Sequence, residues 1–401
     1  MTGAHGLGLL LVLLLPVVSA SIPSTVVRLN KATLSYVSEI GKAPLQRALQ
    51  VTVPYFLDQS GEVLQPTRIQ ILNVHVLHFH LKFIAGFGIH LSAAANLTFK
   101  IFCVPEPLEL TLPVELMADV RVAQGSIGTP VVSISTCFSL LGHSSNFDGS
   151  NSTSHALLAL VQKHIKAVLS NKLCLSIASL VQGINVHLGT LIGLNPVGPE
   201  SQIRYSMINE PTITSDYISL DINAVLFLLG KPIVLPRDAT HFVLPQHVGT
   251  NGTMATVGLS QHLFDSALLL LQKAGALNLD ITGELRSDDN PLNTSALGRL
   301  IPEVVNLSLQ FSMSKVKLQG TTSVLGDIQL TVASSNVGLV DKDQVHMLMG
   351  TVFEKPLLDH LNALLGIGIA LPNVINLLYV TPEVFVYEGY VVISGGLFYQ
   401  H

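Results

Sequence analysis

The chain has 401 residues, which is long enough for two domains. Charged residues make up 12% of it, about half of the ~25% usual in globular proteins, while apolar residues make up 48%. A chain so poor in charge needs extensive buried surface or an apolar cavity, and its net charge of -5 argues against a nucleic-acid partner. Residues 1–100 nevertheless hold seven Lys or Arg against three acidic residues, which would favour anionic head groups.

The first 20 residues predict a secretory signal peptide. Leu7–Val18 is its apolar core, and Val18, Ser19 and Ala20 supply the small residues of a cleavage site. The chain is therefore expected to be secreted and extracellular. Five N-glycosylation sequons agree with export, and they begin at Asn96, Asn151, Asn251, Asn293 and Asn306.

After the signal peptide, Thr25–Gln50 predicts a first helix with Asn30 as its cap. Leu34 and Val37 lie on its apolar side, and Pro44 should kink it or mark a break near its end. Residues 51–137 then change to apolar side chains at every second position, punctuated by Gly, Pro and Asn. This pattern predicts a long antiparallel meander with one apolar face.

Ser154–Cys174 predicts an amphipathic helix around which the first domain is organised. Ser154 is its expected N-cap, Cys174 its expected end, and the apolar stripe consists of Leu157, Val161, Ile165, Val168 and Leu169. We predict that Cys174 pairs with Cys137 and ties the helix to a strand, an arrangement that an oxidising compartment permits. Cys103 is left as the odd thiol of the three cysteines.

The second half repeats the first. Two further strands are expected at 202–208 and 217–227, followed by a Pro-rich connector. The segment from Thr25 matches the segment from Thr256, with Val27 aligned to Val257, and the segment from Glu210 resembles that from Thr381. A near-copy of the Ser154–Cys174 helix is expected at Asp341–Leu365.

The two copies differ in length. Val27 to His155 spans 128 residues, whereas Val257 to Val345 spans only 88, so two or three strands are missing from the second copy. We expect domains at 21–228 and 256–401, the second one shortened, with the connector or a central sheet at 229–255.

Motifs of enzymes and metal proteins are lacking, so we predict no catalytic residue, cofactor or metal site. Strand alternation places His78 and His80 on one face and His75 on the other, and no Asp, Glu or Cys lies between Asn73 and His90 to complete a metal site. Leu361–Val380 has no charge, but its Asn, Gly and Pro residues argue against a transmembrane span.

The apolar stripe of Ser154–Cys174 has two interpretations. Amphipathic helices usually bury such a stripe as ordinary core. Low charge, the absence of Trp and the long alternating strands instead favour a lipid cavity. Burial alone would suffice to hold a lipid, because a 16-carbon tail at ~0.8 kcal/mol per CH₂ offers about 12 kcal/mol before costs.

The opening residues Val26–Leu49, the Cys137/Cys174 pair and the end segments Glu354–Pro372 and Glu383–Tyr399 resemble the BPI/LBP/PLUNC superfamily of secreted lipid-binding proteins, in particular its two-domain family B. The resemblance implies an α+β fold: an elongated molecule of two barrel-like units, each with long helices over a twisted antiparallel sheet, joined by a central sheet. It also implies apolar pockets for the acyl tails of a phospholipid. The pocket wall would fall on Leu34, Val37, Leu157, Val161, Ile165 and Val168, and the family disulfide on Cys137 and Cys174.

The chain departs from that pattern in two respects. Bactericidal members carry dense Lys and Arg at the tip of the first domain, whereas residues 51–99 offer only Arg68 and Lys82, and the second unit is short. We therefore expect a non-enzymatic protein that holds phospholipid-like amphiphiles, with a role in mucosal defence. The alternatives are an antibacterial protein that binds lipopolysaccharide and a structural glycoprotein without a ligand.

Overall fold

The structure is a computed structural model. It describes residues 22–54, 68–102, 107–143, 152–198, 200–236, 240–246, 248–249, 252–277, 299–304, 307–325, 329–334, 357–373 and 376–400. The predicted signal peptide, Cys103 and four of the five sequon asparagines lie outside these residues.

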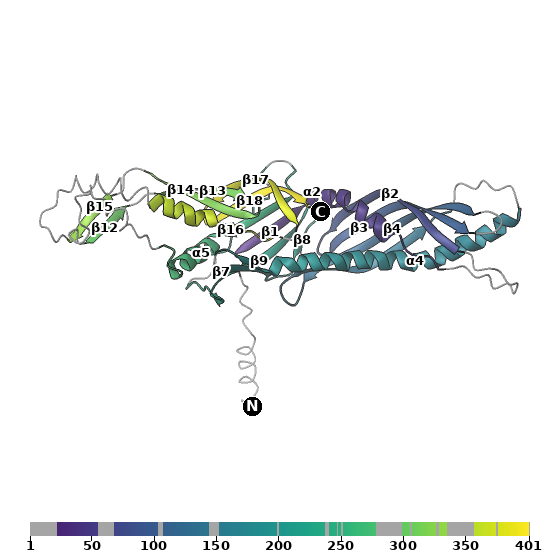
Figure 1. Cartoon of the computed structure of the whole chain (residues 1–401), viewed down its shortest axis with the longest axis horizontal. Helices are drawn as coiled ribbons and strands as arrows, with labels where there is room; N and C mark the ends of the chain where they lie inside the picture. Colours follow the sequence, from purple (N-terminus) through teal and green to yellow (C-terminus); the bar gives the residue numbers. More distant parts are fainter. Residues whose placement is uncertain are drawn as a thin grey trace, which may run out of the picture.

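The molecule is an elongated α+β protein with a helix-and-sheet unit on each side of a central sheet (Figure 1). This confirms the predicted fold class. The domain limits 21–228, 229–255 and 256–401 remain a prediction.

The central sheet joins the two halves of the chain. Its strand order is β17-β18-β11-β1-β9-β7-β6, and the short strands β8 and β10 also pair with β9. The bounds are β1 Thr25–Asn30, β6 Leu194–Pro196, β7 Ser201–Met207, β8 Thr212–Ile213, β9 Tyr217–Leu228, β10 Lys231–Pro232, β11 Ala255–Ser260, β17 Leu377–Tyr387 and β18 Tyr390–Tyr399.

The prediction that the first helix begins at Thr25 is wrong, because Thr25–Asn30 forms strand β1. Its β-branched residues favour a strand, and it has antiparallel partners on both sides, β9 and β11. Asn30 is the N-cap of the following helix, α2 (Lys31–Ile40), as predicted, although its side-chain amide donates to the Thr253 carbonyl rather than to the helix.

Helix α3 (Lys42–Ala48) follows after a break at Gly41, three residues before Pro44. A Cβ at Gly41 would lie 2.7 Å from the Phe79 ring, so the glycine lets this corner of the chain approach the sheet closely. The predicted break near the end of the first helical segment is confirmed.

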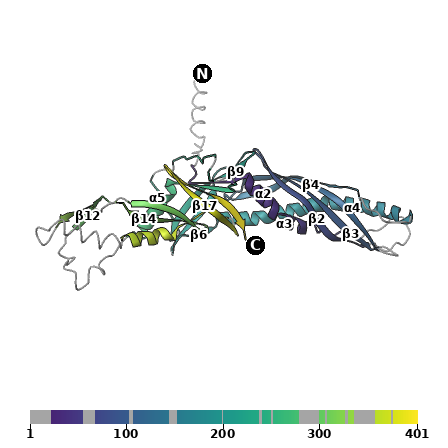
Figure 2. The ribbon, with the colours of Figure 1, turned by 90° about the horizontal axis from the view of Figure 1, so that it is seen from above.

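The first unit contains the predicted meander. It is a four-stranded antiparallel sheet in the order β2-β3-β4-β5, with β2 Arg68–Ile84, β3 Gly88–Phe102, β4 Leu108–Gln124 and β5 Pro130–Leu141. Alternate residues of β3 and β4 are buried beneath helix α4 (Ser152–Leu188), which runs along the length of the unit (Figures 1 and 2).

Helix α4 does not end at Cys174 but continues for fourteen residues to Leu188, where the short 3₁₀ helix η1 (Gly189–Ile192) begins. No helix-breaking residue follows Cys174 directly. Its buried residues recur at every fourth position: Val161, Ile165, Leu169, Leu173, Ile177 and Val181. At ~3.6 residues per turn, each step advances about 40° around the helix, so the buried line winds around α4 as it crosses the twisted sheet.

The predicted disulfide is present. Cys137 of β5 and Cys174 of α4 are bonded, with their Cα atoms 5.9 Å apart. On the same side of α4, the Ser139 hydroxyl donates to the Ser170 carbonyl. Strand β5 is therefore attached to one flank of the helix.

The described residues of the second unit form two helices and two small sheets. It contains helix α5 (Gln261–Lys273), helix Leu357–Ile367, the three-stranded sheet of β13 (Leu307–Ser314), β14 (Lys317–Val324) and β16 (Ile369–Ala370), and the pair of β12 (Arg299–Val304) and β15 (Gln329–Ser334). Strands β13 and β14 have eight residues each, against seventeen in β2 and β4. Of the helix expected at Asp341–Leu365, residues 341–356 lie outside the described part, and the helix continues to Ile367.

Residues Leu361–Val380 do not form one apolar helix, because the described chain passes from the helix into β16 and β17. By length and composition, one described segment, Ala159–Ile192, is apolar enough to cross a membrane. That segment includes most of α4, whose winding stripe is packed on the sheet as in a core helix.

Candidate functional site

The structure places the predicted pocket-wall residues in different surroundings. Val161 and Ile165 are fully buried in the core cluster between α4 and the sheet, and Val168 is half-buried beside them. On α2, Leu34 is buried whereas Val37 is 36% exposed. The side chain of Leu157 is outside the described set.

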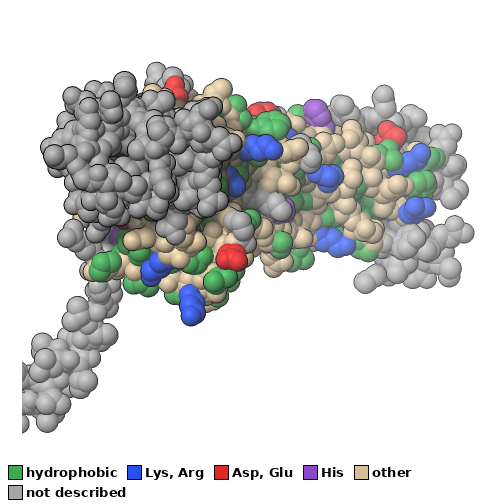
Figure 3. All heavy atoms as spheres, turned by 60° about the vertical axis from the view of Figure 1, so that its left-hand side comes forward, with side chains coloured by type: hydrophobic (Ala, Val, Ile, Leu, Met, Phe, Trp, Pro, Cys, Tyr) green, Lys and Arg blue, Asp and Glu red, His purple; other side chains and the backbone are tan. Residues whose placement is uncertain are grey.

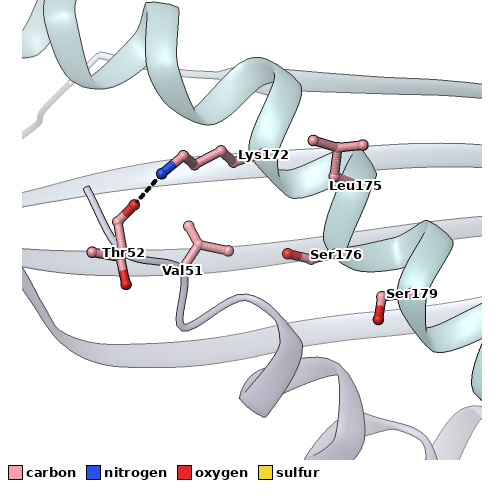
Figure 4. A pocket seen from close by; sticks show the side chains of 6 residues that line it. All are labelled: Val51, Thr52, Lys172, Leu175, Ser176 and Ser179. Carbon is pink, nitrogen blue, oxygen red and sulfur yellow. Dashed lines mark hydrogen bonds between the residues drawn. The ribbon is translucent and has the colours of Figure 1, made fainter. Parts of the chain in front are cut away.

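The flank of α4 opposite the disulfide borders a depression of about 380 Å³ (Figure 4). Its lining comes from the segment after α3 and from the middle of α4, and consists of Val51, Thr52, Lys172, Leu175, Ser176 and Ser179. The volume is near the lower end of the ~300–1,000 Å³ of small-molecule sites.

Lys172 bridges the two walls of this depression. Its Nζ donates a hydrogen bond to the Thr52 carbonyl, at 2.6 Å (Figure 4). No described carboxylate forms an ion pair with it. The ammonium therefore keeps a net positive charge at the edge of an apolar helix.

Four large apolar side chains of α4 are exposed among polar ones. Leu160, Leu175, Ile184 and Val186 are all exposed, Leu175 by 68% and Val186 by 74%. Such side chains usually lie in a core, and of these four Leu175 also lines the depression. Exposed hydrophobic side chains interspersed with Lys and Arg also occur on the face drawn in Figure 3.

Sequence reasoning did not identify the residues of the depression. It followed the buried stripe, whereas the lining consists of four polar residues together with Val51 and Leu175. Lys172, Ser176 and Ser179 recur along α4 at intervals of four and three. That spacing puts them on one flank and was the available signal.

Strand β2 carries three histidines, His75, His78 and His80. No group of three or more His, Cys, Asp or Glu that could hold a metal occurs among the described residues. However, the placement of His75 on the face opposite His78 and His80 is wrong. A β-bulge between Val76 and His78 shifts the alternation by one residue and brings all three to the outward face.

Family models match this architecture over most of the chain. The N-terminal domain of the LBP / BPI / CETP family matches residues 33–187, and its C-terminal domain matches residues 197–324. The chain belongs to the LBP / BPI / CETP family, a family of lipid-binding proteins.

Two relatives align with this chain over nearly their whole length. The chain is 72% identical to human BPI fold-containing family B member 2, with 100% of each chain covered, and 60% identical to the mouse protein of that name, with 96% of each covered. The alignment with the human protein runs over 457 positions against the 401 residues of this chain, so the relative has residues without a counterpart here.

A solved structure shows the same fold at lower identity. The crystal structure of lipopolysaccharide binding protein matches with a TM-score of 0.64 and 19% identity, covering 95% of this chain and 100% of that one. This likeness concerns the fold alone.

Proposed function

We propose that this chain is a secreted, non-enzymatic protein that holds phospholipid-like amphiphiles on the α3–α4 side of its first unit, in mucosal defence. The observation that carries the proposal is Leu175 of α4, 68% exposed, in the lining of a depression that also includes Val51 and Lys172. Lipid acyl chains would cover Leu175 and its neighbours, and each buried CH₂ contributes ~0.8 kcal/mol. Lys172 would lie at the level of the head group.

The predicted pocket-wall residues fit this proposal indirectly. Val161 and Ile165 pack α4 on the sheet, while Val168 is half-buried. Leu34 and Val37 belong to α2, which leads into α3 and the Val51–Thr52 wall.

The test is native mass spectrometry of the secreted chain. We expect co-purifying lipid that is retained at high salt, because apolar burial is insensitive to ionic screening. Leu175→Asp should reduce the bound-lipid fraction. Leu268→Asp, at a comparably exposed leucine of α5, is the matched control and should leave it unchanged.

The same measurement separates the alternatives. A chain without any lipid would indicate the structural glycoprotein. Retention of lipopolysaccharide only at low salt would indicate the antibacterial alternative, in which the basic first part binds anionic groups electrostatically.

A further inference from the structure

The outward face of the β2–β5 sheet carries a row of histidines that the fold brings together. In the β2–β3 register, His75 lies across from Asn96, His78 from Ala94 and His80 from Ser92. These partners alternate with the buried residues Ala93, Ala95 and Leu97, so they point away from α4. His75, His78 and His80 are all exposed, and the rings of His78 and His80 stack with centroids 5.5 Å apart.

The two strands that carry this row contain no acidic residue at all. Their outward ionisable side chains are Arg68, His75, His78, His80 and Lys82 on β2 and His90 and Lys100 on β3. Three of the seven are permanently cationic, and the other four are imidazoles. The face therefore gains positive charge in the pH range in which histidine is protonated.

Carboxylates near the row belong to other elements. Strand β4 presents Glu109, Glu115, Asp119 and Arg121 outward, and the described part of β5 has no ionisable side chain. Asp119 is engaged by His90, whose Nδ1 is 2.7 Å from its Oδ1, and by the Thr136 hydroxyl, and these hydrogen bonds lower the pKa of Asp119. On the helices beside β2, Glu39 pairs with Lys42, Lys31 pairs with Asp216, and Arg47 is exposed.

Apolar side chains lie among these cations. Two bulges leave Leu72 and Leu77 as the extra residues of β2, and they are 44% and 53% exposed. Phe102 is also exposed, with the Arg68 guanidinium 5.3 Å and the Lys100 ammonium 5.6 Å from its ring centroid. Apolar side chains surrounded by basic ones are typical of surfaces that enter the interface of an anionic membrane.

We propose that this histidine face, the outward side of β2 and β3 from Arg68 to Lys82, docks on an anionic lipid bilayer as the pH falls below neutrality. The charge of the two strands on that face rises from three to seven when the four imidazoles are protonated. At ~3.3 Å per residue, the strip extends for about 45 Å along the strand. The exposed leucines distinguish a bilayer from a soluble polyanion, because only a bilayer offers them an apolar phase.

The docking face is on the opposite side of the sheet from α4, so the proposal does not require that the depression hold a lipid. The experiment is vesicle flotation with the full-length secreted chain at pH 7.4 and at about pH 5.5. Vesicles of phosphatidylcholine alone are compared with vesicles that also contain phosphatidylserine. We expect the partition coefficient on the anionic vesicles to rise about tenfold or more at the lower pH, with no rise on neutral vesicles.

The matched variants are His75→Gln/His78→Gln/His80→Gln and His241→Gln, the latter in the connector. The triple variant should lose the pH-dependent rise, while H241Q should keep it. Leu72→Ser/Leu77→Ser should weaken binding at low pH without abolishing its pH dependence. All changed side chains are exposed, and circular dichroism checks that each variant is folded.

Several results would overturn the proposal. One is equal partitioning of the protein onto anionic vesicles at both pH values. A second is an undiminished pH-dependent rise in the triple histidine variant. A third is binding of the protein to heparin but not to vesicles. The Asn96 sequon is on the same face, across from His75. A glycan at Asn96 would cover part of this face, so the flotation experiment is repeated with Asn96→Gln. If N96Q binds the vesicles but the secreted chain does not, docking of the secreted chain is refuted.

Discussion

Val27 of β1 and Val257 of β11 face each other across the antiparallel pair at the centre of the molecule, and they are also the residues that the internal repeat aligns. On the outer sides, Val27 pairs with Leu220 of β9 and Val257 with Ile393 of β18. The two halves are therefore related by a local two-fold axis through this valine pair. The two copies of the sequence repeat are therefore joined through the antiparallel β1–β11 pair.

The symmetry is broken one residue further on. The Arg28 side chain donates to the carbonyls of Leu244 and Pro245 and lies 4.4 Å from the Tyr217 ring centroid. The equivalent position in the second half is Gly258, over which Phe242 packs. The connector is thereby attached to the central sheet on both sides of the axis.

Gly258→Ala should destabilise the protein by about 1–3 kcal/mol, because its Cβ would lie 2.6 Å from side-chain atoms of Phe242 and Leu244. Gly183→Ala is the control with the opposite sign. It lies within α4 with nothing near its Cβ and should stabilise by about 0.5–1 kcal/mol. Urea unfolding measures both, and a loss of stability in G183A or none in G258A would contradict the packing described.

Cys174→Ala should lower the melting temperature by several degrees or more. The two cysteines are 37 positions apart in the sequence, and the loop-closure model gives such a crosslink about 4 kcal/mol. Thermal unfolding followed by circular dichroism measures the shift. The double variant Cys137→Ala/Cys174→Ala should be no less stable than C174A, and an additive loss would show that the residues act separately.

Leu169→Ala should cost about 2–5 kcal/mol, because the side chain is fully buried between α4 and the sheet and leaves a cavity. Leu160→Ala, two to three turns earlier on the exposed side of α4, should change stability by less than about 0.5 kcal/mol. Chemical denaturation of both variants checks the winding stripe. Similar losses at the two positions would mean that α4 is buried on all sides.

The stability of the protein should fall as the pH rises above about 10. The Tyr205 hydroxyl is buried and donates to the Ala370 carbonyl, and burial raises the pKa of both Tyr205 and Tyr379. The unfolded chain loses these protons near pH ~10 while the folded chain keeps them, so the native state is favoured below that pH and loses this advantage above it.

Tyr205→Phe should make the alkaline decline shallower. It should also cost about 1–3 kcal/mol at neutral pH, since the Ala370 carbonyl is left without its donor. Denaturant unfolding between neutral and alkaline pH follows both effects. Parallel declines in the wild type and the variant would show that Tyr205 does not contribute.

The alternation of residues 51–137, the Cys137–Cys174 pair and the Val27–Val257 alignment were readable from the sequence, because each depends on local periodicity or on repetition of the chain itself. Three features were not. Thr25–Asn30 has apolar spacing compatible with a helix, and it is a strand because partners from residues 217–228 and 255–260 lie on both sides. The bulge at Leu77 and the length of α4 likewise depend on neighbouring elements.

By itself, the sequence predicted the α+β class, the duplication and the crosslink from pattern and covalent chemistry, and the resemblance of its end segments indicated the family. Only the tertiary structure decided which face of each element meets solvent. It buried the apolar stripe of α4 as core, left leucines exposed on the opposite side, placed Lys172 beside Val51, and gathered His75, His78 and His80 on one surface. A local pattern indicates which residues share a face, but contacts between residues distant in the chain decide whether that face is covered.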